Sequence, residues 1–140
     1  LLESRGLGDV YKRQTMSKEL SDDSYYILSF WATWCVPCIN ELDALNEVYD
    51  ELSKDLNFKV YAISTDDART KRRVRPLVNG KSWKFDVLLD ENHDLKRALN
   101  ISGLPHTIIA KQNEILHRRV GYAPGEELNL LEKLKEYEVE

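Results

Sequence analysis

The sequence Trp-Cys-Val-Pro-Cys at residues 34–38 constrains this chain more than any other stretch. It contains both of the chain's cysteines, Cys35 and Cys38, which are separated by two residues. It follows an apolar run at residues 25–30 that is rich in strand-forming residues, and it precedes a segment with helical periodicity. A Cys-x-x-Cys between a strand and a helix is typical of thiol–disulfide chemistry.

The expected start of the helix gives the two cysteines different roles. Pro37 fits the first turn of a helix but not its interior, so the helix should begin near Cys35. The N-terminus of a helix stabilises a thiolate, and in such motifs the pKa of a cysteine falls from about 8.5 to roughly 3.5–7.5. We therefore predict that Cys35 is the nucleophile. Cys38, one turn further into the helix, should be more buried and should resolve the mixed disulfide.

The cysteine pair also allows three other interpretations. Structural zinc needs four ligands, but His93, His106 and His117 are scattered and show no ligand spacing. We therefore expect neither a metal nor another cofactor. The cysteines could also be buried, inert thiols, or Cys35 could act alone as a peroxide-reducing cysteine.

Length and composition favour one ordinary α/β domain. The chain has 140 residues, of which 42% are hydrophobic, and this is enough for a single core. Its formal net charge of −4 gives no reason to expect nucleic acid as a partner. No stretch reaches the roughly 18 apolar residues of a membrane span.

The first 14 residues are set apart from the rest of the chain. They lack a hydrophobic period, and Asp9 to Gln14 can be back-translated as GAT GTG TAT AAG AGA CAG, the end of a transposase-type sequencing adapter. We expect residues 1–14 to be a non-native tail and residues 15–140 to be a single domain truncated at its natural N-terminus. A signal peptide or membrane anchor could then have belonged to the lost part. The alternative is a genuine disordered N-terminus, which a continuous genomic contig would establish.

The remaining pattern alternates strands with helices. Such alternation predicts an α/β sandwich with parallel central strands, and it places functional residues at the C-terminal ends of those strands. The last two expected strands are close enough to form a hairpin. Strands are expected at 25–30, 58–64, 85–89, 107–111 and 115–120, and helices from near 35 to 52, at 69–78, at 93–99 and at 125–137.

Two separated motifs resemble one known family. Phe-Trp-Ala-Thr-Trp-Cys-Val-Pro-Cys at residues 30–38 resembles the active-site segment of the thioredoxin superfamily, in its TlpA/ResA-like branch. Gly-Leu-Pro-His-Thr at residues 103–107 stands where that family has its cis-proline loop. The resemblance covers about residues 25–137. It implies a thioredoxin-like three-layer sandwich with a mixed central sheet and a C-terminal hairpin and helix, and it implies thiol–disulfide oxidoreductase activity.

The same resemblance implies a substrate-binding surface around the cysteines. Pro105 should be cis and should face the pair, and the backbone beside it should bind an extended substrate segment. The alternative is an ordinary trans proline at the start of a strand. His106 departs from the Pro-Thr that is common here, and it is interpreted either as a polar neighbour of the pair or as a plain surface histidine. The expected substrate-binding residues are Trp34, Val36, Pro37, Leu104, Pro105 and His106.

Proton transfer needs a group besides the cysteines. Many thioredoxins have a buried aspartate six residues before the first cysteine, but this chain has Ser29 there, which cannot accept a proton at neutral pH. Glu41 lies three residues after Cys38 on the same helical face, and the TlpA/ResA-like branch has a glutamate at this position. We predict that Glu41 is the acid/base for Cys38, with a pKa raised by partial burial. The alternative is a solvated glutamate.

The resemblance further implies partners and a location. Protein disulfides are the expected substrates, an upstream protein supplies electrons, the chain is a monomer, and the site of action is the bacterial cell envelope or periplasm. A reductase is expected, although related motifs span about −270 to −120 mV. A non-catalytic binding module is the alternative.

A basic cluster forms either a solvated helix face or a docking surface: Arg69, Lys71, Arg72, Arg73 and Arg75.

Overall fold

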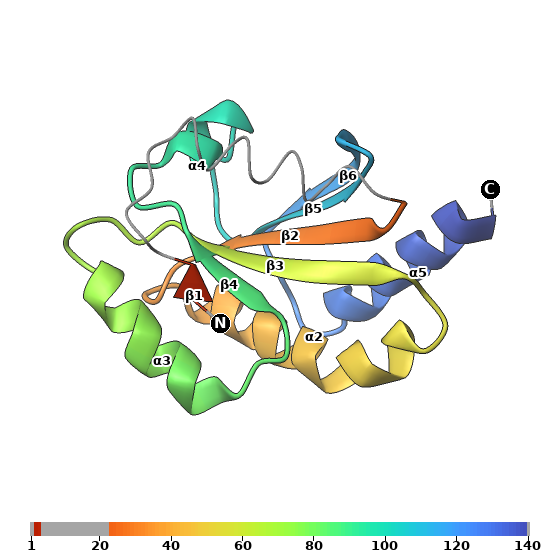
Figure 1. The fold of residues 1–140 in the computed structure, drawn as a ribbon, viewed down its shortest axis with the longest axis horizontal. Coiled ribbons are helices and arrows are strands. Elements are labelled where there is room, and N and C mark those ends of the chain that lie inside the picture. The colour runs from red at the N-terminus through yellow and green to blue at the C-terminus, as the bar shows by residue number, and fades with distance from the viewer. Residues whose placement is uncertain (1, 4–22, 140) are drawn as a thin grey trace.

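A mixed six-stranded sheet forms the middle layer of the computed structural model, which describes residues 2–3 and 23–139 (Figure 1). The strand order is β1-β4-β3-β2-β5-β6. The first four strands in this order are parallel, whereas β5 is antiparallel to β2 and β6 is antiparallel to β5. The strands are β1 (Leu2–Glu3), β2 (Tyr25–Trp31), β3 (Phe58–Ser64), β4 (Asp86–Leu89), β5 (His106–Lys111) and β6 (Glu114–Val120).

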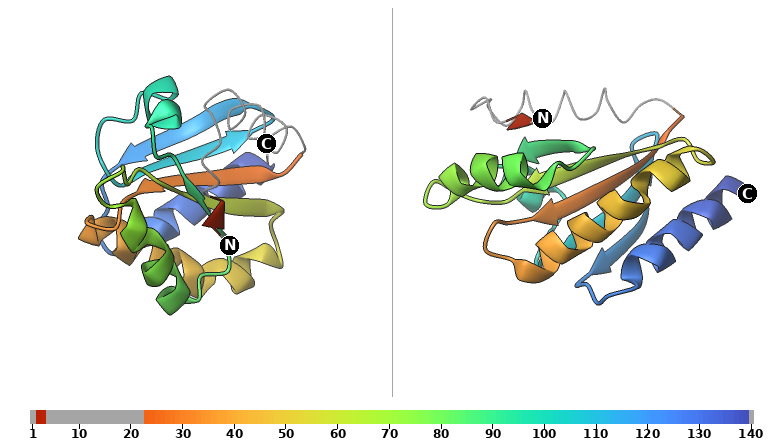
Figure 2. Two further views of the ribbon diagram at one scale, coloured as in Figure 1. Left: turned by 60° about the vertical axis from the view of Figure 1, so that its left-hand side comes forward. Right: turned by 90° about the horizontal axis from the view of Figure 1, so that it is seen from below.

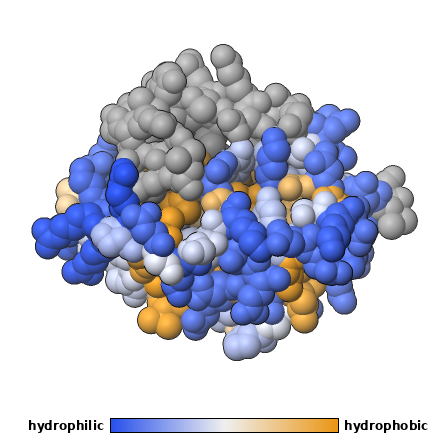
Figure 3. All heavy atoms as spheres, turned by 60° about the horizontal axis from the view of Figure 1, so that its bottom comes forward, coloured by the Kyte–Doolittle hydropathy of each residue, from blue (hydrophilic) through white to orange (hydrophobic). Residues whose placement is uncertain are grey.

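Helices cover both faces of this sheet. α2, α3 and α5 lie on one face and α4 lies on the other, as Figures 1 and 2 show. The outer surface of the three-helix side is mainly hydrophilic, with hydrophobic atoms in smaller areas between the polar side chains (Figure 3). The helical elements are α2 (Val36–Ser53), the 3₁₀ turn η1 (Lys71–Arg73), α3 (Val74–Lys81), α4 (Asp94–Ala98) and α5 (Glu126–Val139).

The sheet separates two hydrophobic clusters, because successive residues of a strand point to opposite faces. In β2, Ile27 belongs to the cluster beneath α2 and α5, and Leu28 belongs to the cluster beneath α4. β2 is buried along its whole length, as its continuous apolar run predicts. The predicted three-layer sandwich with a C-terminal hairpin and helix is confirmed.

The second predicted helix is the least accurate element. It was expected at 69–78, but α3 runs from Val74 to Lys81, and Ser82 takes the left-handed conformation after it. Pro76 lies in the first turn of α3, where its missing N–H leaves no intrahelical hydrogen bond unmade. The helix boundary therefore shifts toward the C-terminus.

Two smaller findings concern the β5–β6 hairpin and the N-terminal residues. The hairpin between β5 and β6 has Gln112 and Asn113 at its tip, both with positive φ, and this conformation matches the twist of a two-residue hairpin. Leu2 and Glu3 pair with β4, and residues 4–22 lie outside the described part. The hypothesis that residues 1–14 are non-native stays a prediction. No described helix has both the length and the apolarity that a membrane crossing requires.

Candidate active site

The two cysteines form a disulfide at the start of α2. Cys35 is the N-cap residue, with φ −103° and ψ 98°, and the backbone N–H of Cys38 donates to Cys35 Sγ at 3.3 Å. The helix start predicted near Cys35 is confirmed. Cys38 is fully buried, whereas Cys35 is 7% exposed and is therefore the sulfur nearer to solvent. This difference supports the predicted order of attack.

Asp66 fixes the loop that leads to Cys35. Its buried carboxyl group accepts from the Thr33 backbone N–H at 3.0 Å and from three hydroxyls, those of Thr33 (2.6 Å), Ser64 (2.6 Å) and Thr70 (2.7 Å). Thr33 lies two residues before Cys35, so these hydrogen bonds tie the active-site loop to the end of β3.

The residues next to the two cysteines in the sequence expose apolar side chains. Trp34 is 59% exposed and Val36 is 65% exposed, and Pro37 also lies at the surface. These positions agree with the predicted substrate contacts, which stay predictions. Val120, which sequence reasoning missed, is also exposed and lies beside Gly103, where an added Cβ would come within 3.1 Å of Val120 Cγ1.

The loop before β5 lies at the same end of the sheet as Cys35. The register pairs His106 with Phe30, so Pro105 lies next to the C-terminal end of β2. The Leu104–Pro105 peptide bond is cis, and the Pro105 carbonyl accepts from the Gly121 N–H at 2.8 Å. Pro105 is buried and Leu104 is half-buried. Binding of substrate by this loop stays a prediction.

His106 is not the surface histidine that one interpretation expected. It is 4% exposed, and Arg118 Nη1 lies 3.4 Å from its Nε2. Burial, followed by the nearby Arg118, lowers the pKa of His106 below its usual value. Strand alternation places its side chain on the α4 side of the sheet, opposite Thr107 and Glu41. A direct substrate contact by the imidazole is therefore not available in this conformation.

Glu41 lies in the interior, one turn after Cys38 on the buried face of α2. Its side chain is fully buried, so the interpretation as a solvated glutamate is wrong. Thr107 Oγ1 donates to its carboxylate with both oxygens at 3.1 Å, and Arg119 Nη2 donates to Oε2. Glu41 thus joins the cysteine helix to both strands of the C-terminal hairpin.

Burial raises the pKa of Glu41 to about 7. The positive charge of Arg119 and the hydrogen bond from Thr107 oppose this rise, whereas the nearby Glu127 and Glu126 reinforce it. A carboxyl group with a pKa near neutrality can both accept and donate a proton under physiological conditions. The structure therefore gives Glu41 the acid–base property that its predicted role requires.

The raised pKa of Glu41 predicts a specific pH dependence of stability. The pKa of Glu41 is about 7 in the folded chain, compared with its ordinary value of 4.5, which we take for the unfolded chain. The folded chain therefore binds this proton more tightly. The contribution of this tighter proton binding to the free energy of unfolding is therefore complete below pH 4.5. It is lost as the pH rises to about 7, and the loss is on the order of 3 kcal/mol. Urea unfolding of the oxidised protein between pH 4.5 and 8 should show this loss, and Glu41→Gln should flatten it. An equally steep profile in the variant would contradict the assignment.

Arg119 is the main functional residue that sequence reasoning missed. A buried Glu41 implies a cationic partner, but the chain has 20 lysines and arginines among which the sequence alone cannot choose. Asp66 was missed for a similar reason, because its partners come from separate segments. Among the described residues, no group of three or more His, Cys, Asp or Glu side chains is placed to hold a metal ion.

Comparison with known proteins agrees with this geometry. The model of the AhpC/TSA family matches residues 6–119. The thiol-disulfide oxidoreductase ResA of Bacillus thuringiensis (strain Al Hakam) is 29% identical over 102 residues, which cover 72% of this chain and 57% of that protein. The chain thus spans little more than half the length of this curated relative.

Solved structures support the same fold. A thioredoxin-like protein from Porphyromonas gingivalis is 37% identical, with a TM-score of 0.71 and coverage of 81% of this chain and 75% of that chain. A protein from Chlorobium tepidum described as a thiol:disulfide interchange protein DsbE has a TM-score of 0.75 at 22% identity, with 86% and 82% of the two chains covered.

Proposed function

Because this chain belongs to the AhpC/TSA family, with a thioredoxin-like fold, we propose that it is a thiol–disulfide oxidoreductase that reduces protein disulfides. The observation that carries the proposal is the Cys35–Cys38 disulfide at the N-terminus of α2, one helical turn before a buried carboxyl group of near-neutral pKa. The similarity to ResA supports the same reaction class.

The reaction begins with the reduced pair. The Cys35 thiolate attacks one sulfur of the substrate disulfide, which forms a mixed disulfide and releases the other substrate sulfur as a thiolate. The Cys38 N–H that donates to Cys35 Sγ in the disulfide is placed to stabilise the Cys35 thiolate after reduction. The exposed Trp34 and Val36 supply apolar contact to the substrate at this stage.

The second step returns the enzyme to its disulfide form. Cys38 transfers its proton to the Glu41 carboxylate and attacks Cys35 Sγ, and the second substrate sulfur leaves as a thiolate. Two electrons have then passed from the cysteine pair to the substrate, and an electron-donor protein restores the dithiol by the reverse exchange. Because Cys38 is fully buried, a nearby internal base is needed to remove its proton.

Replacement of Glu41 tests this proton transfer. Glu41→Gln should slow the resolving step roughly 100-fold or more at pH 7, because a positioned base is lost. Rapid-mixing measurement of release of the second product thiol from a preformed mixed disulfide would show the change. Glu47→Gln on the exposed side of α2 is the matched control and should keep the wild-type rate. An unaltered pH profile in Glu41→Gln would remove Glu41 from the mechanism.

The proposed activity itself has a direct assay. The purified protein should accelerate reduction of insulin disulfides by dithiothreitol, and the reduction potential of the cysteine pair should lie nearer to −270 mV than to −120 mV. A value at the oxidising end would replace reductase with oxidase. No acceleration of insulin reduction would favour a non-catalytic binding module, and consumption of hydrogen peroxide would favour a thiol peroxidase.

The partners and location follow from the same proposal. A soluble or membrane-bound dithiol protein supplies electrons, protein disulfides receive them, and a monomer is sufficient because the described site lies within one chain. We place the protein in the bacterial cell envelope, by its resemblance to the TlpA/ResA-like branch. Fractionation of cells that express the natural gene tests this location.

A further inference from the structure

Arg119 reaches Glu41 from the last strand of the sheet and is held at several points. Its Nη2 donates to Glu41 Oε2, its Nη1 donates to the Glu126 carbonyl at 3.1 Å, and its Nε donates to the Gly121 carbonyl at 3.4 Å. The Glu126 carboxylate lies 3.8 Å away from Nη1. Only 16% of the Arg119 side chain is exposed.

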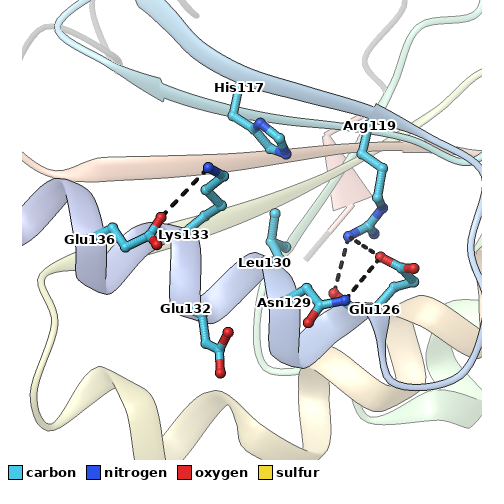
Figure 4. A pocket seen from close by; sticks show the side chains of 8 residues that line it. All are labelled: His117, Arg119, Glu126, Asn129, Leu130, Glu132, Lys133 and Glu136. Atoms are coloured by element: carbon cyan, nitrogen blue, oxygen red, sulfur yellow. Dashed lines mark hydrogen bonds and ion pairs between the residues drawn. The ribbon is translucent and has the colours of Figure 1, made fainter.

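One side of Arg119 borders solvent. It lines a pocket of about 380 Å³ between β6 and α5, where Figure 4 shows its interactions with Glu126. The other side contacts the buried carboxylate of Glu41. Arg119 therefore contacts both Glu41 and this pocket.

The surroundings of Glu41 leave Arg119 as the main source of opposing charge. From the sheet, β5 supplies the neutral hydroxyl of Thr107 and β6 supplies Arg119. α5 supplies the acidic Glu126 and Glu127, and Tyr122 lies in the connection before that helix with its hydroxyl bonded to Glu127. On α2 itself, the preceding turn carries Cys38.

We propose that Arg119 is a positioning residue, which orients the Glu41 carboxylate and keeps its ionised form accessible inside the protein. A buried carboxyl group without a cation would remain protonated and could not accept the proton of Cys38. If Arg119 paired with Glu41 alone, it would keep the Glu41 carboxylate ionised and would oppose its protonation. Arg119 shares its charge with Glu126, so neither form of Glu41 is excluded.

The arrangement uses properties that belong to arginine. The planar guanidinium donates in several fixed directions at once, which lets one side chain bind Glu41 and two backbone carbonyls together. Lysine has a single ammonium group and cannot span these acceptors. Arg119→Lys should therefore retain the charge effect in part but lose the orientation.

Titration of Glu41 in the oxidised protein tests the inference, which rests on the proposed function only for the consequence at Cys38. In Arg119→Met, the ¹³C NMR signal of the Glu41 carboxyl should titrate about 1 to 3 pH units higher than in the wild type. Arg119→Lys should give a smaller shift in the same direction, and it supplies the test if Arg119→Met does not fold. An unchanged midpoint in the folded variants would overturn the proposal.

Arg118 provides the matched control. It is the neighbouring arginine of β6, but it is exposed and donates to the Leu99 carbonyl on the opposite face. Arg118→Met should leave the titration of Glu41 unchanged, and an equal shift there would overturn a specific role for Arg119. If the midpoint of Glu41 moves in Arg119→Met but the pH profile of the resolving step does not, Arg119 is supported as the counter-ion and the proposed role of Glu41 toward Cys38 fails.

Discussion

Replacing Cys35 with serine is expected to abolish disulfide reduction, with a loss of at least about 1,000-fold, because a serine hydroxyl cannot replace the thiolate as attacking group. Replacing Cys38 with serine should have a different result. Cys35 remains the N-cap residue of α2 and can still attack, but nothing resolves the product. The Cys38→Ser variant should therefore accumulate as a covalent mixed disulfide with its substrate.

Both outcomes can be measured on one substrate. Insulin reduction reports turnover, and intact-mass spectrometry reports the trapped species after incubation with a disulfide-bonded peptide. The Cys35→Ser and Cys38→Ser variants act as controls for each other, since each retains one thiol in the same helix turn. Trapping in Cys35→Ser instead of Cys38→Ser would reverse the assigned roles. Full insulin reduction by Cys35→Ser would show that the cysteine pair is not the catalyst.

The parts of this site that could be predicted from the sequence are local. Cys35, Cys38 and Pro37 lie within four residues, so their relation to the helix start follows from proline and capping chemistry. The place of Glu41 follows from helical spacing, although its complete burial does not, because that depends on the hairpin packed over it. The order of strands and helices also followed from periodicity.

The residues that could not be predicted depend on contacts between distant segments. Arg118 and Arg119 are equivalent in the sequence, and only the pairing of Thr107 with Arg119 across the hairpin places one of them toward Glu41. A shift of this register by one residue would exchange their faces. The burial of His106 follows from the same alternation, on the opposite face of β5.

The second large expected effect concerns the loop before the cysteines. Asp66→Ala should lower the free energy of unfolding by about 3 kcal/mol and the Tm by roughly 10 °C, because the donors that now converge on its buried carboxyl group lose their acceptor. The Thr33 N–H is among them, so the backbone before Cys35 should also loosen. Below the Tm, alkylation of reduced Cys35 at fixed pH should show a changed rate.

Asp67 separates this effect from a general loss of negative charge. It is adjacent in the sequence, but its carboxylate accepts from the backbone N–H of Arg69 at 2.9 Å and pairs with the exposed guanidinium of the same residue, and neither interaction involves Thr33. Asp67→Ala should therefore lower the thermal midpoint much less than Asp66→Ala and leave the Cys35 alkylation rate almost unchanged, because exposed interactions contribute little. Equal destabilisation by the two variants would show that charge at this edge, and not the hydrogen bonds to Thr33 and Thr70, supports the active-site loop. If only Asp66→Ala destabilises the protein and alters the reactivity of Cys35, then the hydrogen bonds of Asp66 at the end of β3 help to position the nucleophile.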